Sequence, residues 1–223
     1  MEFSDVIARR RMVRNYDPDR PVPAPARDRL LRAAQRAPSA GFTQGTEFLV
    51  LESPADRETF WAATTPAVHE APPEPPAPPA ALASADQSTA IPAGRWLAGM
   101  RRAPLLVVCF SHRQAYADRY GEPDKHEDDI DTRWQVPYWH IDTGFTALMM
   151  LLDAVDQGLG ACFFGVPTNR VGALRDAFGV PGGYTPVGVV SVGYPAPDHR
   201  PASLHRPRRG VADVAHLGHW SRR

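Results

Sequence analysis

Apolar and polar residues follow helical spacing in some parts of the chain and form short apolar runs in others. Helical spacing predicts a short first helix over residues 4–10, capped by Ser4, and a second helix over residues 26–36. The prolines between residues 18 and 23 separate these helices, because proline interrupts the helical hydrogen-bond ladder. Ser53 followed by Pro54 predicts the start of a third helix.

Short apolar runs bounded by turn-forming residues predict strands. Such runs occupy residues 47–51, 103–110, 161–166 and 185–195. Between the last two runs, Thr168 is expected to cap a helix that Gly179 ends. Strands that alternate irregularly with helices favour an α+β fold, with helices packed on a sheet.

Residues 140–157 predict the strongest helix of the chain. One side carries an apolar stripe at helical spacing, formed by Phe145, Leu148, Met149, Leu152 and Val155. Small and apolar residues cover much of the remaining surface, namely Ala147, Met150, Leu151 and Ala154. A helix that is apolar on nearly all sides is expected to be buried in a core or in a subunit interface, and we therefore predict a homodimer. Gly158 is expected to end the helix in a left-handed conformation.

Two segments lack a clear hydrophobic period. The proline-rich segment, about residues 66–94, predicts a long loop that is either extended or disordered. The acidic segment, about residues 121–134, predicts a solvated loop, with a lid that selects substrate as the alternative for both segments. Because the flanking elements look too small to fold alone, we predict a single domain over residues 1–223.

The composition excludes several classes of function. The chain has 223 residues with 25 Lys and Arg and 25 Asp and Glu, so its net charge is +0. A neutral chain lacks the overall field that attracts nucleic acid or an anionic membrane, so neither is expected as a partner. No apolar leader opens the sequence and no apolar stretch is long enough to cross a bilayer, which predicts a cytoplasmic protein.

The candidate metal ligands and thiols point to no metal centre. Cys109 and Cys162 lie inside apolar runs and are expected to be buried, reduced thiols. His216 and His219 are close in sequence, but the chain contains no H-E-x-x-H motif and no paired cysteines.

The glycines between Gly158 and Gly165 superficially suggest a dinucleotide-binding loop. Their spacing is G-x-G-x-x-x-x-G rather than G-x-G-x-x-G. Their context is also reversed, since a predicted helix precedes them and a predicted strand follows, whereas pyrophosphate binding needs a helix N-terminus after the glycines. A Rossmann site is therefore not predicted.

Two clusters of arginine lie far apart in the sequence. One comprises Arg9, Arg10, Arg11 and Arg14, and the other comprises Arg206, Arg208 and Arg209. Guanidinium groups bind phosphate through paired hydrogen bonds, so the clusters could form two sides of one phosphate pocket. Two solvated surfaces are the alternative, and the spacing alone leaves both interpretations open.

Four motifs in order give the chain a resemblance to the flavin-dependent nitroreductase family. Residues 10–16 resemble the family's opening R-R-S-x-R-x-F segment, and residues 37–46, APSAGFTQGT, resemble its A-P-S-x-x-N-x-Q-P-W segment. Residues 158–165 resemble its G-L-G-x-x-x-x-G segment, and Arg208-Arg209 with the tail that follows resembles its basic C-terminal stretch. The resemblance implies a mostly antiparallel sheet flanked by helices and FMN bound at a homodimer interface.

The resemblance also implies roles for individual residues. Arg10 and Arg11, together with Arg208 and Arg209, would hold the FMN phosphate, and Arg14 would lie near the pyrimidine edge of the flavin. The ribityl chain and ring edge would be lined by Ser39, Ala40, Thr43 and Gln44. The backbone of Phe163, Phe164 and Gly165 would approach flavin N5, where a glycine permits close contact.

The implied activity is hydride transfer from NAD(P)H through flavin N5 to a nitroaromatic, a quinone or a similar electrophile, with no side chain needed as a general base. A flavin-dependent dehydrogenase of a biosynthetic intermediate and a non-catalytic flavin-binding homologue are the alternatives. Three departures motivate the last of these. Met12, within the cofactor-binding segment, replaces the usual serine, Gly45-Thr46 replaces Pro-Trp, and Phe42 replaces asparagine. Phe42 would either stack near the flavin or plug the core.

Overall fold

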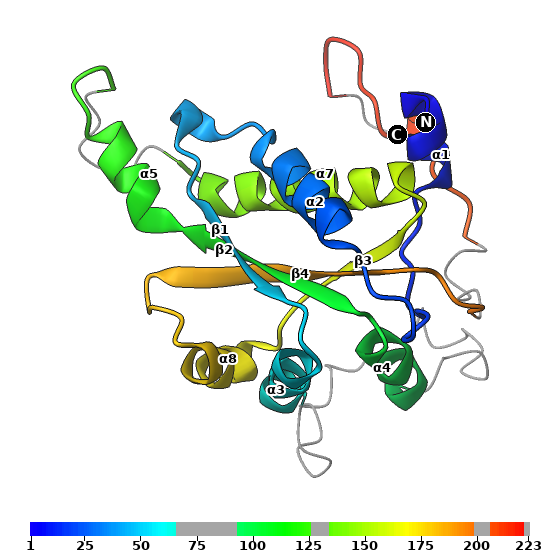
Figure 1. Cartoon of the computed structure of the whole chain (residues 1–223). Helices are drawn as coiled ribbons and strands as arrows, with labels where there is room; N and C mark the ends of the chain where they lie inside the picture. Colours follow the sequence, from blue (N-terminus) through cyan, green and yellow to red (C-terminus); the bar gives the residue numbers. More distant parts are fainter. Residues whose placement is uncertain (66–92, 126–133, 199–205, 221–223) are drawn as a thin grey trace, which may run out of the picture.

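A four-stranded antiparallel sheet between two layers of helices forms the body of the protein (Figure 1). The computed structural model describes residues 1–65, 93–125, 134–198 and 206–220. The sheet has the order β1-β2-β4-β3, and all three neighbouring pairs are antiparallel. Its strands are β1 (Thr46–Leu51), β2 (Leu105–His112), β3 (Gly160–Phe164) and β4 (Tyr184–Gly193).

Helices cover both faces of this sheet (Figure 1). On one face α2 (Ala24–Gln35) packs on α7 (Tyr138–Asp156), with α1 (Phe3–Arg9) and α5 (Arg113–Tyr120) at opposite ends of α7. The other face carries α3 (Pro54–Thr64), α4 (Ala93–Arg101) and α8 (Val171–Phe178). Three short 3₁₀ turns complete the described elements, namely η1 (Ala40–Phe42), η4 (Thr168–Arg170) and η6 (Val211–Asp213). The predicted α+β fold is therefore confirmed.

The central strand β2 explains why its sequence is apolar without interruption. Successive side chains of a strand point to opposite faces, and both faces of this sheet are covered. Leu105, Val107 and Cys109 join the core beneath α2 and α7. Leu106, Val108 and Phe110 join a second core against α3, α4 and α8. Both cysteines are free and buried, as predicted.

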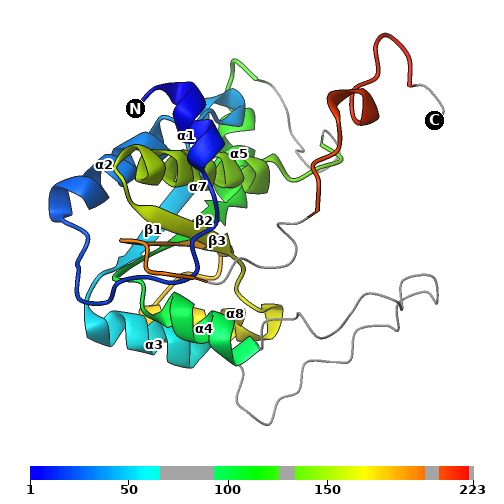
Figure 2. The ribbon, with the colours of Figure 1, turned by 90° about the vertical axis from the view of Figure 1, so that its right-hand side faces the viewer.

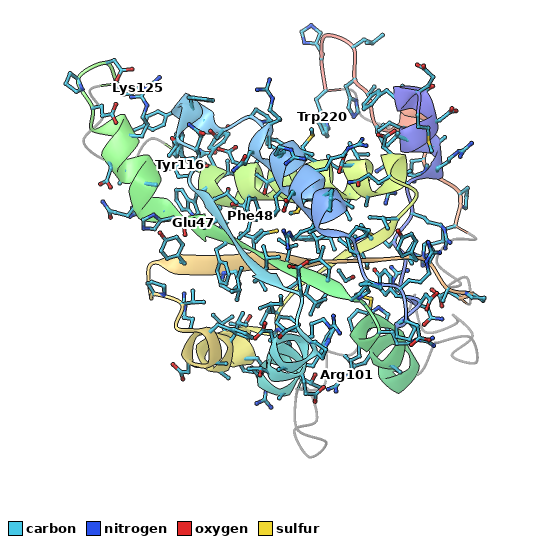
Figure 3. All side chains as sticks on the ribbon, viewed as in Figure 1. Glu47, Phe48, Arg101, Tyr116, Lys125 and Trp220 are labelled. Atoms are coloured by element: carbon cyan, nitrogen blue, oxygen red, sulfur yellow. The ribbon has the colours of Figure 1, made fainter. Side chains whose placement is uncertain are left out.

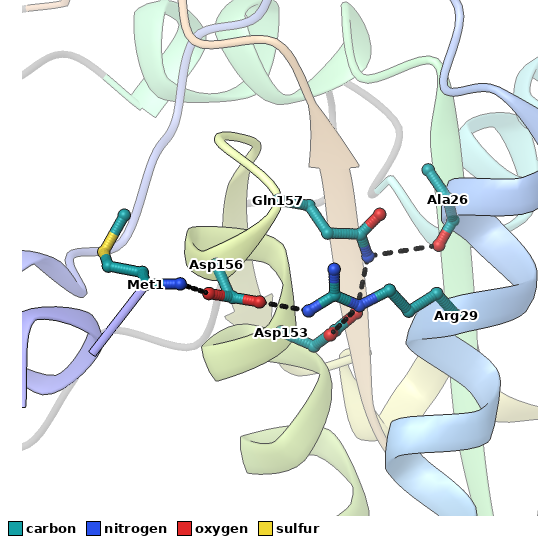
Figure 4. Close-up of polar contacts among 6 residues, drawn as sticks. All are labelled: Met1, Ala26, Arg29, Asp153, Asp156 and Gln157. Atoms are coloured by element: carbon teal, nitrogen blue, oxygen red, sulfur yellow. Dashed lines mark hydrogen bonds and ion pairs between the residues drawn. The ribbon is translucent and has the colours of Figure 1, made fainter. Parts of the chain in front are cut away.

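An ion-pair cluster fastens α2 to the end of α7 (Figure 4). The guanidinium of Arg29 lies 2.9 Å from Asp153 and also pairs with Asp156. The terminal ammonium of Met1 lies 2.7 Å from Asp156, and it lowers the pKa of that carboxyl together with Arg29. Gln157 donates a hydrogen bond to Asp153, which completes the cluster.

The helix signals in the sequence were partly right. Ser53 accepts a hydrogen bond from the Asp56 N–H, as a cap should. The cap assigned to Ser4 is wrong, because α1 starts at Phe3 and no side chain caps it. The cap assigned to Thr168 is also wrong, since this residue lies inside a 3₁₀ turn without a side-chain cap. Gly158 and Gly179 have the predicted left-handed conformation, with φ of 72° and 64°.

Two helices, α4 and α5, were not predicted from the sequence. The proline-rich segment hid the start of α4, which lies in its last two residues, while the acidic segment begins one residue beyond α5. Most of the proline-rich segment (66–92) and the centre of the acidic segment (126–133) lie outside the described residues. The loop assignments there remain predictions.

Helix α7 turns a different side to the core from the stripe that dominated its sequence pattern. The buried side consists of Asp142, Thr143, Thr146, Ala147, Met150, Leu151 and Ala154. Within the predicted stripe, Phe145 and Leu148 are 41% and 45% exposed. The apolar stripe of α7 therefore faces outward in one chain.

The C-terminal tail, residues 206–220, stands away from the layered body (Figure 2). It carries large apolar side chains that are mostly exposed, with Val211 at 79%, Leu217 at 95% and Trp220 at 86%. Exposed apolar surface on this scale is typical of segments that pack against another molecule.

Gly99 gives a test of how α4 is seated. A Cβ atom added there would lie 2.2 Å from the carbonyl oxygen of Arg14, which is backbone and cannot move aside. We predict that Gly99→Ala lowers the free energy of unfolding by about 1–3 kcal/mol in urea denaturation. Gly172→Ala in α8 is the matched control, because nothing lies within 4 Å of the added atom. Equal stability of the two variants would contradict this packing.

Candidate functional site

The arginine-rich segment that follows α1 lies along the outer edge of β3. The Val13 N–H donates to the Ala161 carbonyl at 2.9 Å, and Met12 forms a parallel bridge with Ala161. A Cβ at Gly160 would lie 2.8 Å from the Val13 side chain, so the absence of one lets the segment sit closely on the strand. The motifs at residues 10–16 and 158–165 are thus neighbours in space.

Tyr16 locks this segment from beneath. Its side chain is completely buried, and its hydroxyl donates to the Val13 carbonyl at 2.6 Å. The same hydroxyl shares a 2.8 Å hydrogen bond with Ser191 Oγ, which in turn lies 3.3 Å from the Cys162 carbonyl. Burial raises the pKa of Tyr16 far above its usual value, so the phenol stays neutral.

The guanidinium groups of the segment point in different directions. Arg10 and Arg14 are half-buried, whereas Arg11 is exposed. Arg14 acts on β3, because burial raises the pKa of Cys162 and the charge of Arg14 partly opposes that shift. Arg11 helps to line a small cavity of about 200 Å³ that also borders Gly160.

The outer edge of β3 is open beyond its contact with Met12 and Val13. The N–H and C=O groups of alternate residues point to the same edge of a strand. Since the Ala161 carbonyl faces outward, the N–H groups of Phe163 and Gly165 face outward as well. The described residues offer these two N–H groups no backbone partner on that side.

The side chains around this edge keep the strand rigid. The ring of Phe163 fits against Gly188, where an added Cβ would lie 2.2 Å from the ring. The ring of Phe164 stacks on Trp61 with centroids 5.7 Å apart. Both aromatic side chains therefore point into the two cores, and the strand offers its backbone, not these rings, at its outer edge.

The second group of predicted residues, Ser39, Ala40, Thr43 and Gln44, lies in the loop around η1. This loop contacts the start of α7, because the Ala40 N–H donates to Asp142 at 2.8 Å. The arginine segment lies near the other end of α7, which is 19 residues long and so about 28 Å. One chain therefore does not bring the two groups of predicted cofactor residues together.

Arg208 and Arg209 form a third location. Both are exposed in the tail, and Arg209 donates to the carbonyl of Asp213. Figure 2 shows that the tail leaves the body on a path away from α1 and the segment that follows it. The two arginine clusters thus do not converge within one chain.

A larger cavity of about 920 Å³ opens beside β1, between α2 and the start of α7. Its lining includes Leu31, Phe42, Phe48, Val50 and Asp142. Phe48 points toward the layer of α2 and α7, on the side of the sheet where Tyr116 also lies (Figure 3). This cavity combines an apolar floor with a few polar groups, which is usual for ligand sites.

Phe42 does not plug the core. Its side chain is 76% exposed at the mouth of this cavity, so that interpretation of the sequence is wrong. Sequence reasoning also missed Asp142, a carboxyl on the buried side of α7 that holds Ala40 and accepts a 2.7 Å hydrogen bond from Tyr116. An acidic residue within an otherwise apolar helix was the available signal.

Ser111 and His140 resemble a nucleophile and its base, but their hydrogen bonds argue against that role. Ser111 Oγ lies 2.8 Å from His140 Nδ1, while the Trp139 indole N–H donates to His140 Nε2 at 3.3 Å. An indole nitrogen only donates, so Nε2 accepts and Nδ1 carries the proton. Burial lowers the pKa of His140, and a histidine that donates to a serine cannot activate it as a base.

No helix in the described part of the chain is both long enough and apolar enough to span a membrane.

Comparison with known proteins places this geometry in a family. The family model described as Nitroreductase family matches residues 7–194. A search among curated proteins found no match.

Solved structures share the fold over nearly the whole chain. The NfrA1 nitroreductase of B. subtilis has a TM-score of 0.68 and 16% identity, with 99% of this chain and 75% of that chain covered. A protein from Exiguobacterium sibiricum 255-15 in complex with FMN has a TM-score of 0.66 and 19% identity, with 97% of both chains covered. A proposed NADH oxidase from Clostridium acetobutylicum has a TM-score of 0.63 and 25% identity, with 97% and 100% covered. With a family match that begins just ahead of the arginine segment and runs past β3 to the end of β4, the chain belongs to the nitroreductase family.

Proposed function

We propose that this protein is an FMN-dependent oxidoreductase that uses NAD(P)H to reduce a nitroaromatic, a quinone or a similar electrophile. The observation that carries the proposal is the placement of the arginine segment along the open outer edge of β3. Membership of the nitroreductase family and the FMN complex of a structural neighbour support the choice of flavin.

The residues at this edge suit FMN. Arg10, Arg11 and Arg14 supply guanidinium groups that match a phosphate or an electron-rich ring edge. The outward N–H groups of Phe163 and Gly165 are donors without a described backbone partner, and a ring nitrogen could accept from them. Gly165 has open space where a side chain would be, which leaves room for a close approach.

The protein's part in the reaction is binding, orientation and electrostatics. When bound, FMN would supply the redox chemistry, accepting a hydride at N5 and passing it to the electrophile. Arg14 would hold positive charge against the ring edge that becomes more negative on reduction. Tyr16 and Val13 would keep the arginines in register with β3, and no general base is assigned.

We further propose a homodimer as the functional unit. The outward apolar stripe of α7 and the apolar tail are both left uncovered in one chain. The loop around η1 and the arginine segment lie near opposite ends of α7, so a second copy could bring one group of cofactor residues to the other. Packing of the tail on a dimer would also give Arg208 and Arg209 a fixed position.

The visible spectrum provides the first test. We predict that the purified protein binds FMN and that its flavin absorbance bleaches when NADH or NADPH is added without oxygen. Bound flavin that neither nucleotide reduces would favour a dehydrogenase of another substrate or a non-catalytic homologue. Protein that cannot be reconstituted with FMN would contradict the proposal.

The arginine clusters can be tested separately. We predict that Arg10→Ala/Arg11→Ala weakens FMN binding roughly 30-fold or more, because each charge-assisted contact contributes about 2 kcal/mol. Arg208→Ala/Arg209→Ala should weaken it as well if the tail joins the phosphate site. Arg32→Ala/Arg102→Ala removes two exposed positive charges elsewhere and is the control. Unchanged FMN affinity in both test variants would remove the phosphate role from the arginines.

The dimer prediction rests on the outward stripe of α7. We expect a dimer in sedimentation at micromolar concentration, and we expect Phe145→Asp/Leu148→Asp to give monomers because charges would be buried in the interface. Thr59→Asp, on an exposed position of α3, should leave the dimer intact. A wild-type monomer under these conditions would rule out the dimeric unit.

A further inference from the structure

We infer that Phe42 is a specificity-determining residue, held outward so that its ring stacks on a planar, electron-poor aromatic ring. This inference rests on the proposed function, and the ring could belong to the flavin or to an aromatic substrate. Phe42 lines the mouth of the cavity beside β1 and is 76% exposed. A phenyl ring has an electron-rich face, so it stacks favourably on an electron-poor ring.

The backbone of Phe42 adopts a conformation that a bulky side chain disfavours. Its φ is 56°, between Gly41 at 63° and Gln44 at 55°. Positive φ is uncommon for residues other than glycine and, for a bulky residue, indicates strain. Strained residues of this kind concentrate at binding and catalytic sites, where the surrounding structure must hold them in place.

The surroundings of Phe42 do hold it in place, from two helices. On the α7 side, Asp142 accepts hydrogen bonds from the Ala40 N–H at 2.8 Å and the Tyr116 hydroxyl at 2.7 Å. On the α5 side, the Nε–H of Arg119 donates to the Gly41 carbonyl at 2.9 Å. These contacts fix the residues before Phe42 and leave its own ring free of the core.

The loop is also tied within itself. The Thr43 hydroxyl donates to the Ala40 carbonyl at 2.6 Å, and the Gln44 N–H donates to Ser39 Oγ at 3.0 Å. A Cβ at Gly41 would lie 2.9 Å from the Tyr120 ring, so the chain passes close over α5. An exposed phenyl ring on a loop this firmly anchored contributes little to the fold of its own chain, which points to a ligand.

Asparagine is the informative replacement, because it tolerates positive φ and removes the ring. We expect Phe42→Asn to raise the melting temperature and to weaken binding of the planar ligand about tenfold. Phe42→Leu keeps the backbone strain and loses the ring, so it should weaken binding without raising the melting temperature. Phe42→Trp keeps an aromatic face and should retain binding. A purely structural role would instead move stability and binding down together.

Two measurements identify which ring is contacted. A higher Kd for FMN in fluorescence titration of the apoprotein would assign the contact to the flavin. An unchanged Kd with a higher KM for a planar quinone, but unchanged turnover of ferricyanide, would assign it to the substrate. Either result supports the inference.

Other outcomes overturn it. Phe42→Asn with unchanged FMN affinity and unchanged KM would remove the stacking role while leaving the proposed function intact. Phe42→Asn that melts at lower temperature or forms monomers would show that the ring packs against protein. A wild-type protein that binds no FMN would instead refute the proposed function, and this inference with it.

Discussion

The open edge of β3 is the constraint on which the rest of the site depends. Every edge strand carries unpaired N–H and C=O groups that need a partner. The N-terminal segment satisfies this edge only at Ala161, where Val13 donates its N–H, and the two outward N–H groups that follow are left open. That partial pairing places a run of arginines directly beside unused backbone donors. The family match gives this combination a use in binding a phosphorylated, ring-containing cofactor.

The remaining candidate residues are arranged as if one chain were half of a larger unit. The loop around η1 is fixed to the start of α7 by Asp142, whereas the arginine segment is fixed near the other end of that helix. Between them, α7 turns Phe145 and Leu148 outward. An apolar stripe between two incomplete groups of polar residues is the pattern expected where two identical surfaces meet.

Much of the fold could be predicted from the sequence, because the strands and α7 carry strong apolar patterns. The buried side of α7 could not, since the larger side chains of this helix lie on its outward stripe and smaller ones such as Thr146 and Ala147 face the sheet. Helices α4 and α5 were missed because proline-rich and acidic neighbours masked short amphipathic segments. At the site, the motifs identified the right segments, but the anchoring of the η1 loop by Asp142 and Arg119 depends on contacts more than 70 residues apart in sequence. Neither could be read from local spacing.

Amide hydrogen exchange with and without FMN tests the central claim most directly. If the outer edge of β3 and the arginine segment hold the flavin, FMN should slow exchange at residues 10–14 and at the N–H groups of Phe163 and Gly165. Exchange that is unchanged at these positions while FMN is bound would contradict the account.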